Sequence, residues 1–547
     1  MSRAVVFTHI DERNRLEDTS EILGFYDRRG AFFRSCLACR NISIVFVYSS
    51  YGVEECIRAV LCAKEQPQIP VDVLEKEQRV ANALQMVLER AALHVFGADA
   101  ARRRESGPEF VFIGVRELAC HLNRLMRIDR KLVENFAHQG KSTYDSPKNI
   151  EAIIRIARAR RFPEETVIRV DADVQVDEIA IDRLLECAAV CRADPLQPYW
   201  WFSGGYSGNF DDDPVNVHAV RQHWLVSKET RHNPRGFQLV PNAEAFLADI
   251  AEIGATQFDA RHHPRRSRAA EKMVHDRGYS SRRAGPQVIS GAGLVASAAA
   301  IEKLPPFMNA PAMVVWIDDH LKRLLHEAIG DISPRDPERI DALLRQDRYP
   351  GPDAIDDSDP AEFEKRTHDY FERLLNGCLM EATIETKPNH PGPLATWVHN
   401  VTTATLTRLT ADDEVRLRAE LCDAAQKRFD HVMAVWQHAD YGDDMLAKWA
   451  AGVDDERRKQ ICGRIGDIGA AYVRLCIDWE HHVAAIGTLQ AHDAYWLFTK
   501  PRPLAPAATA PASLAPPAPA GADGGFVEAG SPLPAGEKQS AVRLPPL

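Results

Sequence analysis

Hydrophobic and polar positions follow two different periods between residues 40 and 400. Short runs rich in β-branched and aromatic residues predict strands, and apolar residues spaced three to four apart predict helices between them. The predicted strands lie at residues 41–50, 109–115, 166–170 and 286–297. The predicted helices lie at residues 53–66, 146–161, 177–191 and 318–329. This alternation is typical of an α/β protein.

The remainder of the chain has a different character. Residues 401–500 keep the helical period, and two long stretches open with an aspartate pair suited to a helix N-terminus, so a helical domain is predicted. Residues 501–547 contain 11 of the 34 prolines. Such a segment cannot bury enough apolar surface to offset the entropy lost on ordering, which predicts a disordered Pro/Ala-rich tail. Residues 1–40 are expected to be an N-terminal extension, a strand and a helix packed on the core.

Composition narrows the class of protein. The chain has 547 residues, 45% hydrophobic and 27% charged, which suits a soluble protein of about two to four structural units. Its net charge of -11 argues against a general nucleic-acid binder, because phosphate contacts require a basic surface. We find no secretory signal and no apolar run of about 18 residues, so no transmembrane segment is expected. Eleven cysteines, an odd number, fit reduced thiols and a cytoplasmic location.

The strand predicted at residues 166–170 ends abruptly in Asp171-Ala172-Asp173. Alternate side chains of an extended segment point the same way, and ligands of open α/β sheets bind beyond the carboxyl ends of strands. Two carboxylates that converge there suit a hard divalent cation, Mg²⁺ or Mn²⁺, which often bridges to substrate phosphates. The alternative is that these aspartates only begin a loop and cap the next helix.

The residues upstream of this motif have a characteristic order. Gly140-Lys141 is followed by Asn149 in a predicted helix, and then by the apolar strand that ends in Asp171 and Asp173. In this order the segment resembles the GT-A glycosyltransferases, particularly the family 2-like group. The resemblance implies a GT-A fold, which is a Rossmann-like domain that uses a nucleotide-diphospho-sugar. It also implies that Lys141 and Asn149 lie near the donor nucleotide. The two carboxylates would hold the ribose and the metal, with Asp171 in both roles and Asp173 on the metal.

Ser49, Tyr51 and a histidine are further candidates for the donor and metal sites. Ser49 and Tyr51 lie at the end of the strand predicted at residues 41–50 and are expected to contact the nucleotide. Some GT-A enzymes complete the metal site with a histidine far downstream. His390, in a segment rich in proline and glycine, is the first candidate here, and His399 is the second. A lone histidine is more often not a ligand, so a structural role is the alternative for both.

A second acidic motif follows an apolar run, where Asp318-Asp319 opens a predicted helix. It resembles the "ED" motif of the same family, whose second acid acts as base toward the acceptor hydroxyl in inverting members. The resemblance makes Asp319 the catalytic base and Asp318 its catalytic neighbour. This chain has Asp where the family has Glu at the first position, which leaves open which carboxylate reaches the acceptor. An aspartate at a helix N-terminus is also a common cap, which is the alternative role.

Small and aromatic residues are expected on the acceptor side. The family has a small-residue turn there, and residues 290–293 resemble it, so Gly291 and Gly293 are assigned to the substrate. Glycine permits close approach of the backbone to a ligand, although a plain tight turn uses the same residues. Trp200 and Trp201 precede a glycine-rich stretch, and one of them is expected to face the cleft and stack on a sugar ring.

The α/β domain is predicted to span residues 41–400, with insertions at about 75–135 and 210–285. Residues 261–283, within the second insertion, hold eight Lys or Arg against two acids, with three histidines. Two interpretations stand beside each other. The segment is either a solvated loop, or a lid whose arginines cover the donor diphosphate or an anionic acceptor.

Together these residues predict a metal-dependent glycosyltransferase that moves a sugar from a nucleotide-diphospho-sugar to an acceptor hydroxyl, with inversion implied by the resemblance alone. The expected partners are Mn²⁺ or Mg²⁺, a nucleotide sugar, and a glycan or glycoconjugate acceptor of the bacterial type. A nucleotidyltransferase acting on a sugar phosphate is the enzymatic alternative, although the Gly-rich phosphate loop typical of it is missing. An aspartyl-nucleophile phosphatase would need Thr where the chain has Gln175. The non-catalytic alternative is a scaffold with a vestigial GT-A domain.

Overall fold

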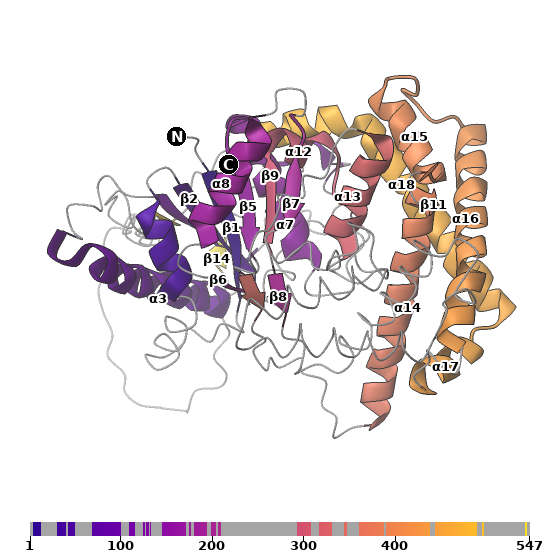
Figure 1. Ribbon diagram of the computed structural model, residues 1–547, viewed down its shortest axis with the longest axis horizontal. Helices are drawn as coiled ribbons and strands as arrows, with labels where there is room; N and C mark the ends of the chain where they lie inside the picture. The colour runs from indigo at the N-terminus through magenta and orange to yellow at the C-terminus, as the bar shows by residue number, and fades with distance from the viewer. Residues whose placement is uncertain are drawn as a thin grey trace, which may run out of the picture.

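A seven-stranded mixed sheet lies at the centre of the N-terminal half of the molecule, and a group of long helices lies beside it (Figure 1). In the computed structural model, the described residues are 4–11, 30–39, 42–49, 68–69, 71–99, 109–114, 124–125, 127–130, 132, 145–170, 174–176, 180–193, 198–203, 206–208, 293–307, 317–330, 344–346, 360–387, 390–437, 444–489, 495–496 and 542–543.

The strand order of this sheet defines its topology. From one edge to the other the strands are β13 (Tyr495–Trp496), β4 (Glu109–Ile113), β2 (Ile42–Ser49), β1 (Ala4–Asp11), β5 (Thr166–Val170), β9 (Gly293–Ser297) and β7 (Trp201–Ser203). The four strands β4, β2, β1 and β5 are parallel to one another, whereas β13 and β9 run antiparallel to their neighbours. The chain therefore moves outward from β1 through β2 to β4 and then returns past β1 to β5.

The hydrophobic runs of the sequence explain why the parallel strands are central. All five residues of β5 are buried, and so are Ala4, Val5, Val6 and Phe7 of β1. Parallel strands covered on both faces read as nearly continuous apolar runs rather than as alternating ones. The α/β class predicted from the sequence is thus confirmed, and the strands predicted near residues 41–50, 109–115 and 166–170 are β2, β4 and β5.

The N-terminal strand lies in a different place from the one we expected. Residues 1–40 were predicted as an extension that packs on the core, but Ala4–Asp11 pairs with β2 on one side and with β5 on the other. An edge or surface strand would leave backbone donors and acceptors to solvent, whereas β1 has both of its sides paired. The sheet therefore starts at residue 4 and not near residue 41.

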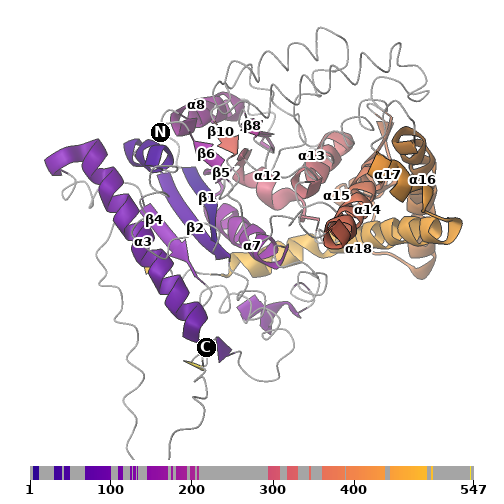
Figure 2. The same cartoon turned by 90° about the horizontal axis from the view of Figure 1, so that it is seen from below.

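Helices cover both faces of the sheet (Figure 2). On one face, helical residues 30–38 pack on β2, where the rings of Phe33 and Phe46 are 5.8 Å apart. The Cys39 thiol donates a hydrogen bond of 3.0 Å to Asp182 of α8 (Ala180–Arg192), which joins residues 30–39 to α8 on this face. The opposite face carries α7 (Asp145–Arg161), which also contacts α12 and α18.

The long helix α3 (Val71–Phe96), followed by the 3-10 turn η2 (Gly97–Asp99), lies alongside β4 (Figure 2). It occupies the start of the insertion predicted at about 75–135. The buried Glu77 carboxylate lies against Gly114, directly after β4, where a Cβ atom would come within 2.3 Å of it. Gly114 thus allows the helix to approach the end of β4. Just before α3, β3 (Gln68–Ile69) pairs with β14 (Val542–Arg543), the one described part of the predicted tail.

The helical half comprises α14 to α18, with α13 beside it (Figure 1). Their bounds are Ile317–Ile329 for α13, Pro360–Ile384 for α14, Pro393–Thr402 for α15, Ala411–Gln437 for α16, Asp444–Ala451 for α17 and Asp455–Gly487 for α18. The short helix α12 (Ala298–Lys303) follows β9 in the α/β half. Because α14 and α15 pack on α16 and α18, the bundle begins near residue 360 rather than at residue 401.

The two halves share one core, because α18 leaves the bundle and packs on α7 (Figure 2). The ring of Tyr472 stacks on Phe307 at 4.0 Å, and its hydroxyl donates to the Pro305 carbonyl at 2.8 Å. About two turns further on, the Trp479 indole donates to the Glu302 carbonyl at 2.8 Å. The predicted helical domain is therefore continuous with the α/β half rather than an independent appendage.

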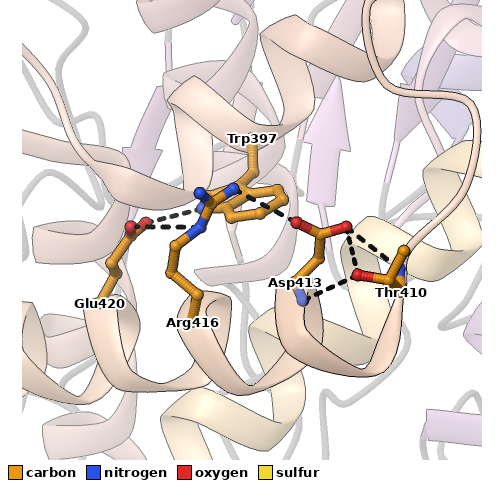
Figure 3. A network of polar contacts seen from close by, with 5 residues as sticks. All are labelled: Trp397, Thr410, Asp413, Arg416 and Glu420. Carbon is orange, nitrogen blue, oxygen red and sulfur yellow. Dashed lines mark hydrogen bonds and ion pairs between the residues drawn. The ribbon is translucent and has the colours of Figure 1, made fainter.

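The junction of α15 and α16 shows how the bundle is held locally (Figure 3). Thr410 and Asp413 form a capping box, in which Thr410 Oγ1 accepts from Asp413 N at 3.1 Å and donates to the Asp413 carboxylate at 2.7 Å. The hydrogen bonds that the Thr410 hydroxyl and the Thr410 backbone N–H donate to the Asp413 carboxylate lower its pKa. Next to it, Arg416 lies 4.8 Å from the centre of the Trp397 ring, and the Trp397 indole donates to Glu420 at 2.7 Å.

Among the described helices, none is long and apolar enough to cross a membrane.

Candidate functional site

The strand order creates a topological switch point between β1 and β5. Thr8 of β1 pairs with Val170 of β5, and the connections on the two sides of this pair lead in opposite directions across the sheet. In doubly wound sheets, ligands bind in the crevice outside the carboxyl ends of the strands at such a point. The carboxyl ends of β1 and β5 are therefore the part of the sheet where a ligand is expected.

The predicted carboxylate motif follows β5 at this point. The strand ends at Val170, and the chain is described again from Val174, where β6 (Val174–Val176) begins. Asp171 and Asp173 themselves lie outside the described residues. The fold does show where the preceding strand lies: β5 leads into these two residues and forms one side of the switch point.

The small-residue turn reaches the same edge from another direction. β9 is antiparallel to β5 and begins at Gly293, which pairs with Val170. Gly291 lies outside the described residues, two positions before this pair. Because Gly293 stands opposite the last residue of β5, the strand that leaves the small-residue turn and the strand that enters the carboxylate motif share one sheet edge. The sequence alone did not reveal that these two strands are neighbours, because more than 100 residues separate them.

The edge continues on the other side of β1. Ser49, the last residue of β2, pairs with Asp11, the last residue of β1, while Tyr51 lies outside the described residues. Asp11 was not among the predicted site residues, although it is the last residue of the strand that forms one side of the switch point. The signal was present in the sequence, because an apolar run from Ala4 also ends in an acid.

A second, three-stranded sheet lies next to the carboxyl end of β5. Its order is β6, β10 (Leu344–Gln346) and β8 (Tyr206–Gly208), with β10 antiparallel to β6 and parallel to β8. Arg345 of β10 pairs with Gln175, two residues after Asp173. Sequence reasoning missed this segment, because a strand of three residues has no period that could be recognised.

The helix α7 supplies another wall of the site. Asn149 lies in its second turn, whereas Lys141 lies before it and outside the described residues. A short turn at residues 162–165 connects α7 to β5, closed by hydrogen bonds from Phe162 N to Arg158 O and from Glu165 N to Phe162 O, both 3.0 Å. The helix thus runs antiparallel to β5, and its N-terminal turns lie toward the carboxyl end of that strand. A helix N-terminus favours anions there.

Buried charges join α7 to β5. The Glu151 carboxylate lies 2.7 Å from Arg155 Nε and 3.3 Å from Arg169 Nε, and the side chains of Glu151 and Arg169 are 1% and 4% exposed. Both contacts are ion pairs by distance. At the other end of the interface, Arg158 forms two hydrogen bonds of 2.8 Å to the buried Glu165 carboxylate.

The fold corrects the prediction for one of the two tryptophans. Trp200 is 2% exposed and belongs to the core, with its carbonyl accepting from Ser297 N at 2.9 Å. A side chain that is enclosed in this way cannot stack on a sugar, so Trp200 is wrong as a substrate contact. Trp201 is the first residue of β7 and pairs with Ala296. Its role as a substrate contact stays a prediction.

The second acidic motif lies at the start of α13. Asp318 and Asp319 occupy the first turn of this helix, as the sequence predicted. Further along the helix, His326 is fully buried, and burial together with Lys322 and Lys303 holds its pKa well below the usual value. This histidine is therefore neutral at physiological pH and part of the packing that anchors α13.

Among the described residues no group of three His, Cys, Asp or Glu side chains could hold a metal ion. His390 is exposed in β12 (His390–Pro391), which pairs with β11 (Glu385–Lys387), and His399 is exposed in α15. The two predicted ligands Asp171 and Asp173 lie outside the described residues, so a role of His390 on a metal stays a prediction.

The Cys36 and Cys39 pair, the one CxxC of the chain, is buried and reduced. Burial, the hydrogen bond to Asp182 and the charge of that residue raise the pKa of the Cys39 thiol. A thiol of this kind is neither a ready nucleophile nor a metal thiolate. The partly buried Arg192 guanidinium, whose pKa is lowered by this burial, donates to the Thr166 hydroxyl at the start of β5.

Comparisons with models of protein families, with curated proteins and with solved structures found no match to this chain.

Proposed function

We propose that the protein is a metal-dependent glycosyltransferase with a GT-A-type, Rossmann-like catalytic half. In this proposal, a nucleotide-diphospho-sugar binds at the carboxyl edge of β1, β2 and β5 and gives its sugar to the hydroxyl group of a glycan or glycoconjugate acceptor. The proposal rests on the order of the sequence motifs together with the positions of the strands that carry them.

The observation that carries the proposal is the register of β5. Val170 pairs with Thr8 on one side and with Gly293 on the other. The strands that lead into the carboxylate motif and out of the small-residue turn therefore meet beside the switch point, where nucleotides bind in doubly wound sheets. A chance occurrence of an Asp-x-Asp sequence would be equally expected at either end of any strand.

The donor residues have distinct tasks in this proposal. Asp173 and Asp171 provide hard carboxylate oxygens, a donor set that fits Mg²⁺ or Mn²⁺. Lys141 and Asn149 contact the phosphates and the nucleoside, and Ser49 lines the same edge from β2. A bound divalent cation supplies neutralisation of the charge on the departing diphosphate.

The acceptor residues complete the reaction. The acceptor oxygen forms a bond to the anomeric carbon of the donor sugar while the bond from that carbon to the diphosphate breaks, and its electron pair leaves with the nucleoside diphosphate. Asp319 takes the proton from the acceptor hydroxyl, with Asp318 beside it. Attack from the side opposite the leaving group inverts the anomeric carbon, as the family resemblance implies.

Binding of a panel of nucleotide sugars tests the proposal. Isothermal titration calorimetry with uridine, guanosine, thymidine and cytidine diphospho-sugars, with Mn²⁺ and with EDTA, should find at least one donor that binds in a metal-dependent manner. Asp173→Asn should weaken this binding about 100-fold or more, because a charged ligand to the metal is lost. Asp423→Asn, which changes an exposed aspartate on α16, is the matched control and should bind like the wild type.

Other outcomes separate the alternatives. Release of pyrophosphate from a nucleoside triphosphate and a sugar phosphate would identify a nucleotidyltransferase. Failure of every donor to bind would contradict the proposal and leave the scaffold alternative. Equal binding by the wild type and Asp173→Asn would show that this carboxylate is not part of the donor site.

A further inference from the structure

Two ion-pair clusters, each built around a buried acid, connect α7 with β5 and with the turn that precedes it, and they lie at opposite ends of the interface. The first consists of Glu151 with Arg155, at 2.7 Å, and with Arg169, at 3.3 Å. The second consists of Arg158 and Glu165, with two contacts of 2.8 Å, and Arg158 also donates to Ser43 Oγ of β2 at 3.2 Å. Glu151 and Glu165 are almost completely buried in both cases.

The first cluster lies next to the candidate site along both elements. Glu151 is two residues after Asn149 in α7, and Arg169 is two residues before Asp171 at the end of β5. The second cluster lies at the other end of the helix, because Glu165 closes the turn that precedes β5. The two clusters therefore resemble each other in chemistry and in the burial of their acid, although Arg158 is 18% exposed and Arg169 4%. They differ in their distance along the chain from the predicted ligands.

Stability alone does not account for charges at these positions. Removing an acid and two arginines from water is costly, and apolar residues of similar volume are often as stabilising or more so. What an ion pair adds is direction, since Glu151 of α7 meets Arg169 of β5 only at one rotation and one height of α7 on the sheet. A cluster that connects α7 near Asn149 to β5 near Asp171 sets the relative position of these two segments.

We propose that Glu151 and Arg169 are positioning residues of the candidate site. Their ion pair holds the N-terminal turns of α7 at a set distance from the end of β5, so that groups from both elements contact one ligand at the same time. The nature of that ligand, a metal-bound nucleotide diphosphate, rests on the proposed function. The positioning itself does not depend on it. Supporting groups of this kind typically change ligand affinity about 10- to 100-fold when they are altered.

The test compares Glu151→Gln with Glu165→Gln, which removes the corresponding charge from the far cluster. Both variants should unfold at a lower temperature than the wild type, because both lose a buried ion pair. With Mn²⁺ and the donor that binds best, measured where all proteins are folded, Glu151→Gln should raise the dissociation constant about 10- to 100-fold. Glu165→Gln should change it less than about 2-fold, and Arg169→Lys, which keeps the charge, should recover part of the affinity lost in Arg169→Met.

A second measurement does not require a ligand. In hydrogen-exchange mass spectrometry, peptides that cover residues 145–152 and 171–176 should exchange faster in Glu151→Gln and in Arg169→Met than in the wild type. The same peptides should be unchanged in Glu165→Gln. A global loss of structure would instead raise exchange over α14 and α16 as well, which serve as the internal reference.

The outcomes are distinguishable from those of the proposed function. If no nucleotide sugar binds the wild type, the glycosyltransferase proposal fails, while the exchange data still decide on positioning. If Glu151→Gln and Glu165→Gln weaken binding equally, or if exchange near residues 171–176 is the same in both, Glu151 is only one more contributor to stability and the inference is overturned.

Discussion

The crossing of α16 and α18 gives a sharp prediction about packing, because α18 has glycines at positions 463, 466 and 469. A Cβ atom on Gly469 would lie 2.4 Å from Cδ1 of Leu421, which is fully buried in α16. A Cβ atom on Gly463 would have nothing within 4 Å. The same substitution therefore has opposite consequences at two positions of one helix.

The magnitudes follow from two terms. In a helix interior, Gly→Ala is favourable by about 0.5–1 kcal/mol, because alanine has less backbone entropy to lose. We expect this gain in full for Gly463→Ala. At Gly469 the same gain is opposed by overpacking against Leu421, which costs about 1–3 kcal/mol. Since helix propensity contributes equally to both variants, the difference between them isolates the packing cost and should be about 1–3 kcal/mol.

Urea unfolding followed by far-ultraviolet circular dichroism measures this difference. Gly463→Ala should have a higher midpoint than the wild type, and Gly469→Ala a lower one. In a Leu421→Ala background, Gly469→Ala should cost less or become favourable, because the opposing side chain has been removed. If Gly469→Ala proved as stable as Gly463→Ala in the wild-type background, the close crossing of the two helices would be refuted.

Two predictions concern pH. The pKa of His326 lies well below its ordinary value because of burial, Lys322 and Lys303, and burial with Arg428 lowers the pKa of His431 to about 4. Below about pH 6.5, both histidines bind protons in the unfolded chain but not in the folded chain. The free energy of unfolding should therefore fall as the pH decreases from 6.5. The fall should be about 1.4 kcal/mol per pH unit for the fully buried His326 and less for His431. Thermal unfolding between pH 7.5 and 5.5 measures this slope, which should be smaller in His326→Leu; an equal slope would contradict it. Burial alone would raise the pKa of Glu372 in α14, but hydrogen bonds from Arg457 and Arg464, at 2.7 and 2.6 Å, outweigh it and lower the pKa. This stabilisation is present above the unfolded pKa near 4.5 and is lost as the pH falls through the folded pKa. Because the side chains of this ion pair are partly exposed, Glu372→Gln should cost only about 1 kcal/mol of folding free energy at neutral pH. The cost should be smaller at pH 3. An equal cost of Glu372→Gln at both pH values in urea titrations would contradict the assignment.

The sequence predicted most of the elements that carry the candidate site. β5 begins and ends where its β-branched run does, and α7 and α13 begin within one residue of the predicted starts. These elements were predictable because their hydrophobic period, caps and breakers are local properties. The α/β class followed from their alternation.

What the sequence did not reveal depends on contacts between distant segments. Residues 1–40 were expected to hold a strand and a helix, but no property of residues 4–11 indicates that β2 and β5 will pair on both sides of them. Trp200 and Trp201 are chemically the same, and the burial of Trp200 depends on β9, almost 100 residues away. The pairing of Arg345 with Gln175 is likewise a product of the tertiary fold.

The release of nucleoside diphosphate from a nucleotide sugar is the most direct test of the central claim, that the edge beside β5 is a metal-dependent sugar-transfer site. With the donor identified by calorimetry, the rate should depend on Mn²⁺ or Mg²⁺, should be abolished by EDTA, and should fall about 100-fold or more in Asp173→Asn. Asp423→Asn should retain the wild-type rate. A rate that is independent of the metal, or equal in the wild type and Asp173→Asn, would contradict the account.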